Sequence, residues 1–76
     1  MQAKTLKGYR WIVRDPDLLG GQPTVRDTRI SVVQVLECLS IGMTAQDIAD
    51  DYPGFDADSV PEVLKFAADQ VQNVAA

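Results

Sequence analysis

Gly20-Gly21-Gln22-Pro23-Thr24-Val25-Arg26-Asp27-Thr28-Arg29-Ile30 is the stretch on which the fold of this chain depends. The glycine pair permits positive φ, and the proline holds the residue before it in extended conformations, so the chain changes direction here. Two β-branched runs, Thr24-Val25 and residues 28–30, flank Arg26-Asp27 and predict a β-hairpin with a two-residue loop. In that loop Asp27 needs a left-handed or bridge conformation, which aspartate tolerates better than most residues.

The composition is that of one small folded domain. With 76 residues, 46% of them hydrophobic, the chain builds only a modest core, and we expect a homo-oligomer or a partner to support it. One cysteine and no histidine exclude an internal disulfide, a cysteine-rich metal site and the commonest general base. No apolar run is long enough to span a bilayer, and residues 1–7 show no signal-peptide pattern, so we expect a cytoplasmic protein without a membrane contact.

Charge divides the chain into two unlike parts. Residues 1–30 carry six basic and three acidic side chains, a net charge of +3, whereas residues 31–76 carry one basic and eight acidic side chains, a net charge of −7. A basic surface suits a polyanion, and an acidic surface suits a basic protein. The sequence therefore predicts two faces with different partners.

The segment before the hairpin contains one expected strand. Residues 1–8 show no periodicity and predict a mobile, basic lead-in. Residues 9–14 are aromatic and β-branched and predict a short strand. We therefore divide a single domain over residues 1–76 into this lead-in, a β-hairpin region at 9–30 and three helices at 31–74.

The helices are expected from apolar spacing and capping residues. Ser31 precedes a buried stripe over residues 32–41 that ends at Gly42, and Thr44 precedes a short helix that ends at the Pro53-Gly54 corner. The third helix is predicted to begin near Ser59, in a capping box with Glu62. An Asp56 start is the alternative, which places Pro61 deeper in the helix at the cost of a hydrogen bond.

The third helix carries the clearest apolar pattern and leaves a surplus at its end. Its expected stripe consists of Val60, Val63, Leu64, Ala67 and Val71. Val71 and Val74 lie beyond the point where three helices cover them, so a partner or dimer contact there is as well supported as a core position.

The element order resembles a mainly α, homeodomain-like three-helix helix-turn-helix domain, preceded by a short N-terminal β-strand and β-hairpin. In such domains the last helix is the one that enters DNA. Its exposed start is acidic here, with Asp56, Asp58 and Glu62, and phosphates repel such a surface. Fold and electrostatics therefore favour different functions, and the charge argues against binding through this helix.

Four motifs make the resemblance specific: Gly21-Gln22-Pro23, residues 26–32, residues 42–48 and Asp51-Tyr52-Pro53. Together with residues 60–67 they are similar to the small bacterial family called domain of unknown function 433, over about residues 11 to 68. The family pattern has Lys, Gly and Pro where this chain has Gln22, Asp27 and Ser31.

The resemblance implies a function in protein binding. Members of this family are commonly taken to be antitoxins of type II toxin–antitoxin pairs, similar to VapB antitoxins, whose partners are PIN-like nucleases. We therefore expect an antitoxin-like protein that neutralises such a toxin directly, with autoregulation of its operon as a second expectation. The alternative is a DNA-binding transcriptional regulator with no toxin partner.

Candidate contact residues follow from these two functions. For the toxin they are Arg26, Arg29, Val71 and Val74, although hairpin arginines more often pair with nearby carboxylates such as Asp27. For DNA phosphates they are Lys4, Lys7, Arg10 and Arg14. The sequence contains no activated nucleophile and no phosphate-cradling glycine loop, so we predict no enzymatic activity, no catalytic or metal-binding residue and no cofactor.

Overall fold

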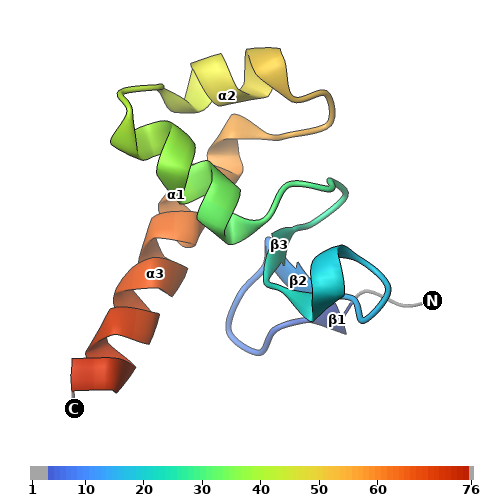
Figure 1. Ribbon diagram of the computed structural model, residues 1–76, viewed down its shortest axis with the longest axis vertical. Coiled ribbons are helices and arrows are strands. Elements are labelled where there is room, and N and C mark those ends of the chain that lie inside the picture. Colours follow the sequence, from blue (N-terminus) through green and yellow to red (C-terminus); the bar gives the residue numbers. More distant parts are fainter. Residues whose placement is uncertain (1–3, 76) are drawn as a thin grey trace.

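The computed structural model describes residues 4–75, which form a small antiparallel sheet beside three α-helices (Figure 1). The strands are β1 (Lys4–Thr5), β2 (Ile12–Arg14) and β3 (Thr24–Val25), in the order β1-β2-β3. The helices are α1 (Val32–Ser40), α2 (Ala45–Asp51) and α3 (Val60–Ala75). Two single turns of 3-10 helix, η1 (Leu19–Gly21) and η2 (Ala57–Ser59), connect them. The expected mainly helical domain with a small N-terminal sheet is confirmed.

The sheet begins earlier than the sequence predicted. A mobile lead-in over residues 1–8 is wrong for Lys4–Thr5, which form β1 and pair with β2 in the register Lys4 to Arg14 and Thr5 to Val13. Residues 1–3 of the expected lead-in lie outside the described residues. The predicted strand at 9–14 is confirmed only over Ile12–Arg14, where Ile12 and Val13 are buried.

The predicted hairpin is only half correct. β3 pairs with β2 across Ile12 to Val25, and residues 28–30 form no strand. Instead, the Thr28 amide closes a turn on the Val25 carbonyl at 3.1 Å, and the Val25 amide donates to the Ile30 carbonyl at 3.0 Å. The Thr28 hydroxyl donates to the Val25 carbonyl at 2.7 Å and accepts from the Ile30 amide. Thr24 and Ser31 form an isolated antiparallel bridge, so residues 26–31 return alongside β3 as a loop longer than the two residues predicted. Asp27 has φ 65°, the left-handed conformation that the turn requires.

The caps of the first two helices confirm the expected boundaries. The Ser31 hydroxyl accepts from the Gln34 amide at 3.0 Å, and Gly42 ends α1 with φ 95°. Thr44 and Asp47 form a reciprocal capping box at the start of α2. Local sequence therefore sets the ends of both helices.

α3 begins at Val60, which confirms the predicted start near Ser59, but Ser59 and Glu62 do not form the predicted capping box. Asp56, and not Ser59, is the cap: its carboxylate accepts from the Asp58 amide and begins η2, which leads into α3. Ser59 is fully buried and donates its hydroxyl to the Asp56 carbonyl at 2.7 Å. The added 3-10 turn keeps Pro61 at the second position of α3, where a missing N–H costs little. The cap that Asp56 gives to η2 therefore carries no proline penalty.

The core lies where α1, α2 and α3 meet the sheet and the 26–31 loop. Ile12, Val25, Val35, Ile48 and Val63 are completely or almost completely buried, and Phe55 fills the corner before η2. The buried face of α3 differs slightly from the predicted stripe: Phe66 lies in the core, whereas Leu64 is exposed. On this face Tyr9 packs its ring edge-on against Phe66, with 5.1 Å between the ring centroids.

Two acidic side chains of α3 accept hydrogen bonds from the segment just before β2 and so hold the sheet against the helix. Glu62 accepts hydrogen bonds from the backbone amides of Arg10 and Trp11. Asp69 accepts from the Tyr9 hydroxyl and from Lys65. The Lys65 bond and then the Tyr9 bond lower the pKa of Asp69, and the same Asp69 bond raises the pKa of Tyr9. Glu62 is thus committed to the fold and does not form the predicted capping box. Across the described part of the chain, no helix is long and apolar enough to cross a membrane.

Candidate functional site

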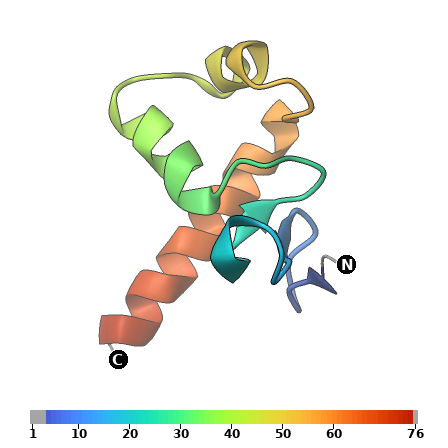
Figure 2. The same ribbon diagram turned by 45° about the vertical axis from the view of Figure 1, so that its right-hand side comes forward.

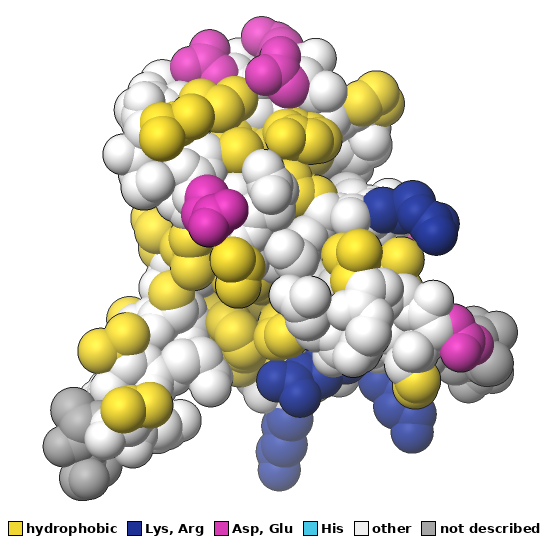
Figure 3. All heavy atoms as spheres, in the orientation of Figure 1, with side chains coloured by type: hydrophobic (Ala, Val, Ile, Leu, Met, Phe, Trp, Pro, Cys, Tyr) yellow, Lys and Arg dark blue, Asp and Glu magenta, His cyan; other side chains and the backbone are white. Residues whose placement is uncertain are grey.

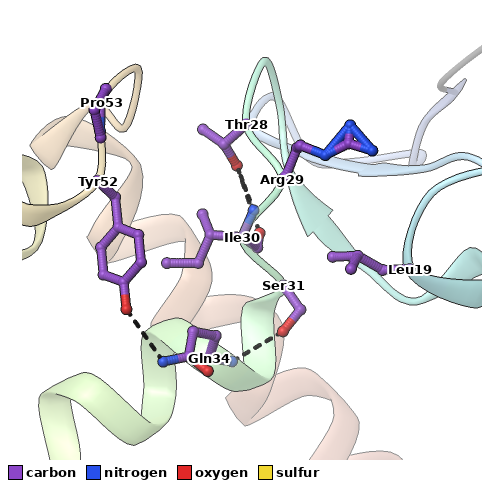
Figure 4. Close-up of a pocket in the computed structure, with 8 residues that line it drawn as sticks. All are labelled: Leu19, Thr28, Arg29, Ile30, Ser31, Gln34, Tyr52 and Pro53. Carbon is purple, nitrogen blue, oxygen red and sulfur yellow. Dashed lines mark hydrogen bonds between the residues drawn. The ribbon is translucent and has the colours of Figure 1, made fainter.

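An open pocket of about 530 Å³ lies between the 26–31 loop, the start of α1 and the end of α2 (Figure 4). Three separate segments build it: η1, the loop into α1, and the turn after α2. The residues that line it are Leu19, Thr28, Arg29, Ile30, Ser31, Gln34, Tyr52 and Pro53. Most of them belong to two motifs far apart in sequence, 26–32 and 51–53, so the fold brings two of the motifs that carry the family resemblance together.

Some hydrogen-bond donors of this pocket remain available to a partner. The hydroxyls of Thr28 and Ser31 are already engaged with the backbone. Gln34 donates from Nε2 to the Tyr52 hydroxyl oxygen at 3.4 Å, which leaves the Tyr52 proton free to donate elsewhere. Arg29 is exposed, and within residues 4–75 no carboxylate lies at ion-pair distance from its guanidinium. The pocket therefore suits an acceptor-rich or anionic side chain of a partner.

The two hairpin arginines have different environments. Arg26 stacks on Trp11, with its Cζ 5.0 Å from the ring centroid, and forms a long ion pair of 3.9 Å with Asp27. Its amide also donates to the Trp11 carbonyl at 2.7 Å. Arg29 extends away from Tyr52 on the side of Leu19 (Figure 4). Of these two candidates, Arg26 serves the fold and Arg29 is available to a partner.

The four candidate phosphate contacts lie on or beside the sheet. Lys4 and Arg14 face each other directly across β1 and β2, and both are exposed. Arg10 places its guanidinium 5.5 Å from the centre of the Trp11 ring, and Lys7 lies exposed in the turn before it. No ion pair of the described residues involves any of the four. Like charges directly opposite each other destabilise a sheet, so the Lys4 and Arg14 pair lowers the stability of this sheet.

Acidic side chains gather at the other end of the molecule. Figure 3 shows them over α2, away from most of the basic side chains around the sheet. The exposed residues of this acidic end are Asp47, Asp50, Asp51, Asp56 and Asp58. In the described part of the chain no lysine or arginine pairs with them. The acidic end therefore lies away from most of the basic side chains, although exposed Glu37 lies on α1 and exposed Asp17 follows β2.

The predicted contacts at the end of α3 are not core residues. Val71 is 68% exposed and Val74 is 87% exposed. Beside them lies an apolar groove between α1 and α3, lined by Pro23, Val32, Val33, Leu36, Phe66, Ala67, Gln70 and Val71. The groove and the pocket lie on different faces of α1, so the fold has two separate candidate contact surfaces.

Sequence patterns did not predict this pocket, because nothing in them singled out Gln34 or Leu19 or placed Tyr52 beside them. Their proximity depends on how the turn after α2 packs, which periodicity does not reveal. The family motif at 51–53 was the available signal. Among residues 4–75, no group of three or more histidine, cysteine, aspartate or glutamate side chains is placed to hold a metal ion.

A match to one protein family covers most of the chain. Residues 12–67 match the family described as "Protein of unknown function (DUF433)". The chain is similar to "Uncharacterized protein y4eO" of Sinorhizobium fredii (strain NBRC 101917 / NGR234), with 33% identity over 49 residues. That match covers 64% of this chain and 22% of the relative, so the chain corresponds to about a fifth of that longer protein. No solved structure matches. Because the family match spans most of the chain and both motifs of the pocket, the chain belongs to the DUF433 family.

Proposed function

We propose that this chain is an antitoxin-like protein that binds a PIN-like nuclease toxin and neutralises it. One observation carries the proposal: a pocket formed by two family motifs lies beside Arg29, an exposed arginine without an ion-pair partner in the described chain. Exposed residues that the fold does not need are where binding is expected. The proposal concerns this chain alone and not the longer protein to which it is similar.

Arg29 supplies the inhibitory contact. PIN-like active sites hold metal ions through acidic side chains, as the family resemblance implies. A guanidinium pairs with a carboxylate through two parallel hydrogen bonds, and it competes with a metal ion for the same oxygens. The 26–31 loop presents Arg29 at the surface, while the adjacent pocket accepts a neighbouring side chain of the toxin.

The acidic end supports the same partner. A nuclease that binds RNA has a basic cleft, and the exposed aspartates of α2 and η2 complement it. Such charge complementarity speeds association and weakens with added salt. Both surfaces border the turn at 51–54, so one toxin molecule can contact the acidic end and Arg29 together.

A second candidate function is DNA binding, and the basic side chains around the sheet favour it. We infer that α1, α2 and α3 correspond to the three helices of a homeodomain-like helix-turn-helix fold. The start of α3 is acidic, so phosphate contacts fall to Lys4, Lys7, Arg10 and Arg14 around the sheet. A protein that meets a nuclease and operator DNA acts in the cytoplasm, without a membrane contact. The two functions are compatible, since the basic and acidic surfaces are separate.

Co-expression tests the proposal. The gene next to the one for this chain is expressed alone and together with it, and cell growth and copurification are measured. We expect the neighbouring protein alone to stop growth, and this chain to restore growth and to copurify. Normal growth without this chain, or absence of a complex, contradicts the antitoxin function.

A further inference from the structure

The apolar groove between α1 and α3 is bordered by a helix end that has nothing to pack against. In Figures 1 and 2 the C-terminal half of α3 extends away from the other elements. Val71 and Val74 are exposed on this part of α3, and Val33, 54% exposed, lies across the groove on α1. Apolar area of this kind in so small a domain marks a contact surface.

The charges around the groove indicate what covers it. None of its lining residues is charged, although charged residues make up 24% of the chain. The charged residues of α3, Glu62, Lys65 and Asp69, are spaced along the opposite side, and two of them bond to the sheet segment. The last six described residues of α3, 70–75, carry no charge. A basic toxin or DNA therefore finds no complementary group here.

The same surface suits a second copy of the chain. Two chains of net charge −4 repel each other wherever their acidic surfaces meet, and this groove is a surface where they do not. It also contains a projecting apolar helix end and a recess beside it, so the helix end of one copy can occupy the recess of another. A two-fold axis pairs each helix end with the recess of the other copy, so every contact forms twice.

We propose that this groove and the end of α3 form a homodimer interface, with the α3 end of each copy lying against the groove of the other. Helix spacing supports the fit: Ala67, Gln70, Val71 and Val74 are three or four residues apart and therefore lie on one face of α3. The dimer leaves the pocket, Arg29 and the basic side chains of the sheet uncovered. Two copies then offer two toxin sites and two phosphate-binding surfaces.

The test measures the mass of the purified chain alone by sedimentation equilibrium, from about 1 μM to about 200 μM. We expect twice the 8.3 kDa chain mass at the upper concentrations. Val71→Lys and Val33→Lys, on the two sides of the groove, each raise the dimer dissociation constant about tenfold or more. Ile41→Lys is the matched control, because Ile41 is 79% exposed on another face of α1, and it leaves the constant unchanged. Far-ultraviolet circular dichroism verifies that each variant is folded.

A monomer at every concentration overturns the proposal, as does a dimer that both groove variants leave intact. A chain that is monomeric alone but loses toxin binding with Val71→Lys assigns the groove to the toxin instead and also overturns it. Because the measurement uses no toxin, its failure is distinct from failure of the antitoxin function, which depends on Arg29.

Discussion

The carboxylate of Glu62 on α3 accepts a hydrogen bond from the backbone amide of Trp11, just before β2. The Arg10 amide donates to the other carboxylate oxygen at 2.9 Å. The sheet is small, with strands of two or three residues, and makes few bonds of its own. This carboxylate therefore holds the sheet and its basic side chains in place on the helices.

Glu62→Gln tests that attachment. An amide has only one acceptor oxygen, so one of the two backbone N–H groups then faces an NH₂ group. We expect the free energy of unfolding in urea to fall by about 1–3 kcal/mol. Glu37→Gln on the exposed face of α1 is the control and changes it by about 0.5 kcal/mol or less. Equal effects of the two variants contradict the role of Glu62.

The bond from Tyr9 to Asp69 makes stability depend on pH at both extremes. Asp69 has a pKa below its ordinary 3.8, so its contribution is present above that pH and is lost as pH falls through the lower folded value. Tyr9 has a pKa above its ordinary 10.0, so its contribution is present below pH 10.0 and is lost as pH rises through the higher folded value.

Tyr9→Phe removes this contribution. At neutral pH we expect the wild type to unfold at a higher urea concentration than the variant, and the difference to vanish in strong acid and above the folded pKa of Tyr9. A difference that stays constant from pH 3 to pH 11 contradicts the bond.

Asp27 holds a left-handed conformation that most side chains resist. Asp27→Gly relieves the strain and raises the free energy of unfolding by about 0.5 kcal/mol, and Asp27→Val lowers it by about 1–2 kcal/mol. Asp27→Asn isolates the exposed ion pair with Arg26, which contributes about 0.5 kcal/mol or less. A stability gain with valine contradicts the observed turn.

Local signals in the sequence predicted much of this fold, and tertiary contacts explain the remainder. Ser31, Gly42 and Thr44 set helix ends because caps act on neighbouring amides. The sequence did not predict β1, because two residues with no apolar alternation gain their order only by pairing with β2. Glu62 looked like a capping residue, but its partners lie more than fifty residues away in sequence.

Only part of the candidate site was predictable from the sequence, because some of its contacts also join segments that are far apart along the chain. Arg29 stands out in sequence, and its exposure follows from the loop. The pocket beside it requires Tyr52 and Gln34 to meet across eighteen residues, which only the packing of α2 on α1 provides. Phosphate candidates were found by charge alone, whereas the opposition of Lys4 and Arg14 depends on strand register.

DNA binding, the second function, makes its own prediction. Replacing Lys4 and Arg14 with Gln weakens binding to the protein's own promoter and reduces the slope of log affinity against log salt by about two. Asp56→Asn with Asp58→Asn leaves that slope unchanged, because the start of α3 lies off the DNA. A larger effect of the aspartate pair assigns DNA binding to α3 and contradicts binding through the sheet. Gel-shift titrations at several salt concentrations measure the affinity and its salt dependence for both double variants.

The affinity of the purified chain for the nuclease encoded beside it, measured by calorimetry for wild type and for Arg29→Glu, tests the central claim most directly. Arg29 forms no ion pair within the described chain, so the variant keeps the stability of the wild type to within about 0.5 kcal/mol. We predict wild-type binding at micromolar concentration or tighter, and a dissociation constant raised about a hundredfold in the variant, as expected for a charge pair made repulsive. Equal affinity of the two proteins, or no binding by the wild type, would contradict neutralisation through Arg29.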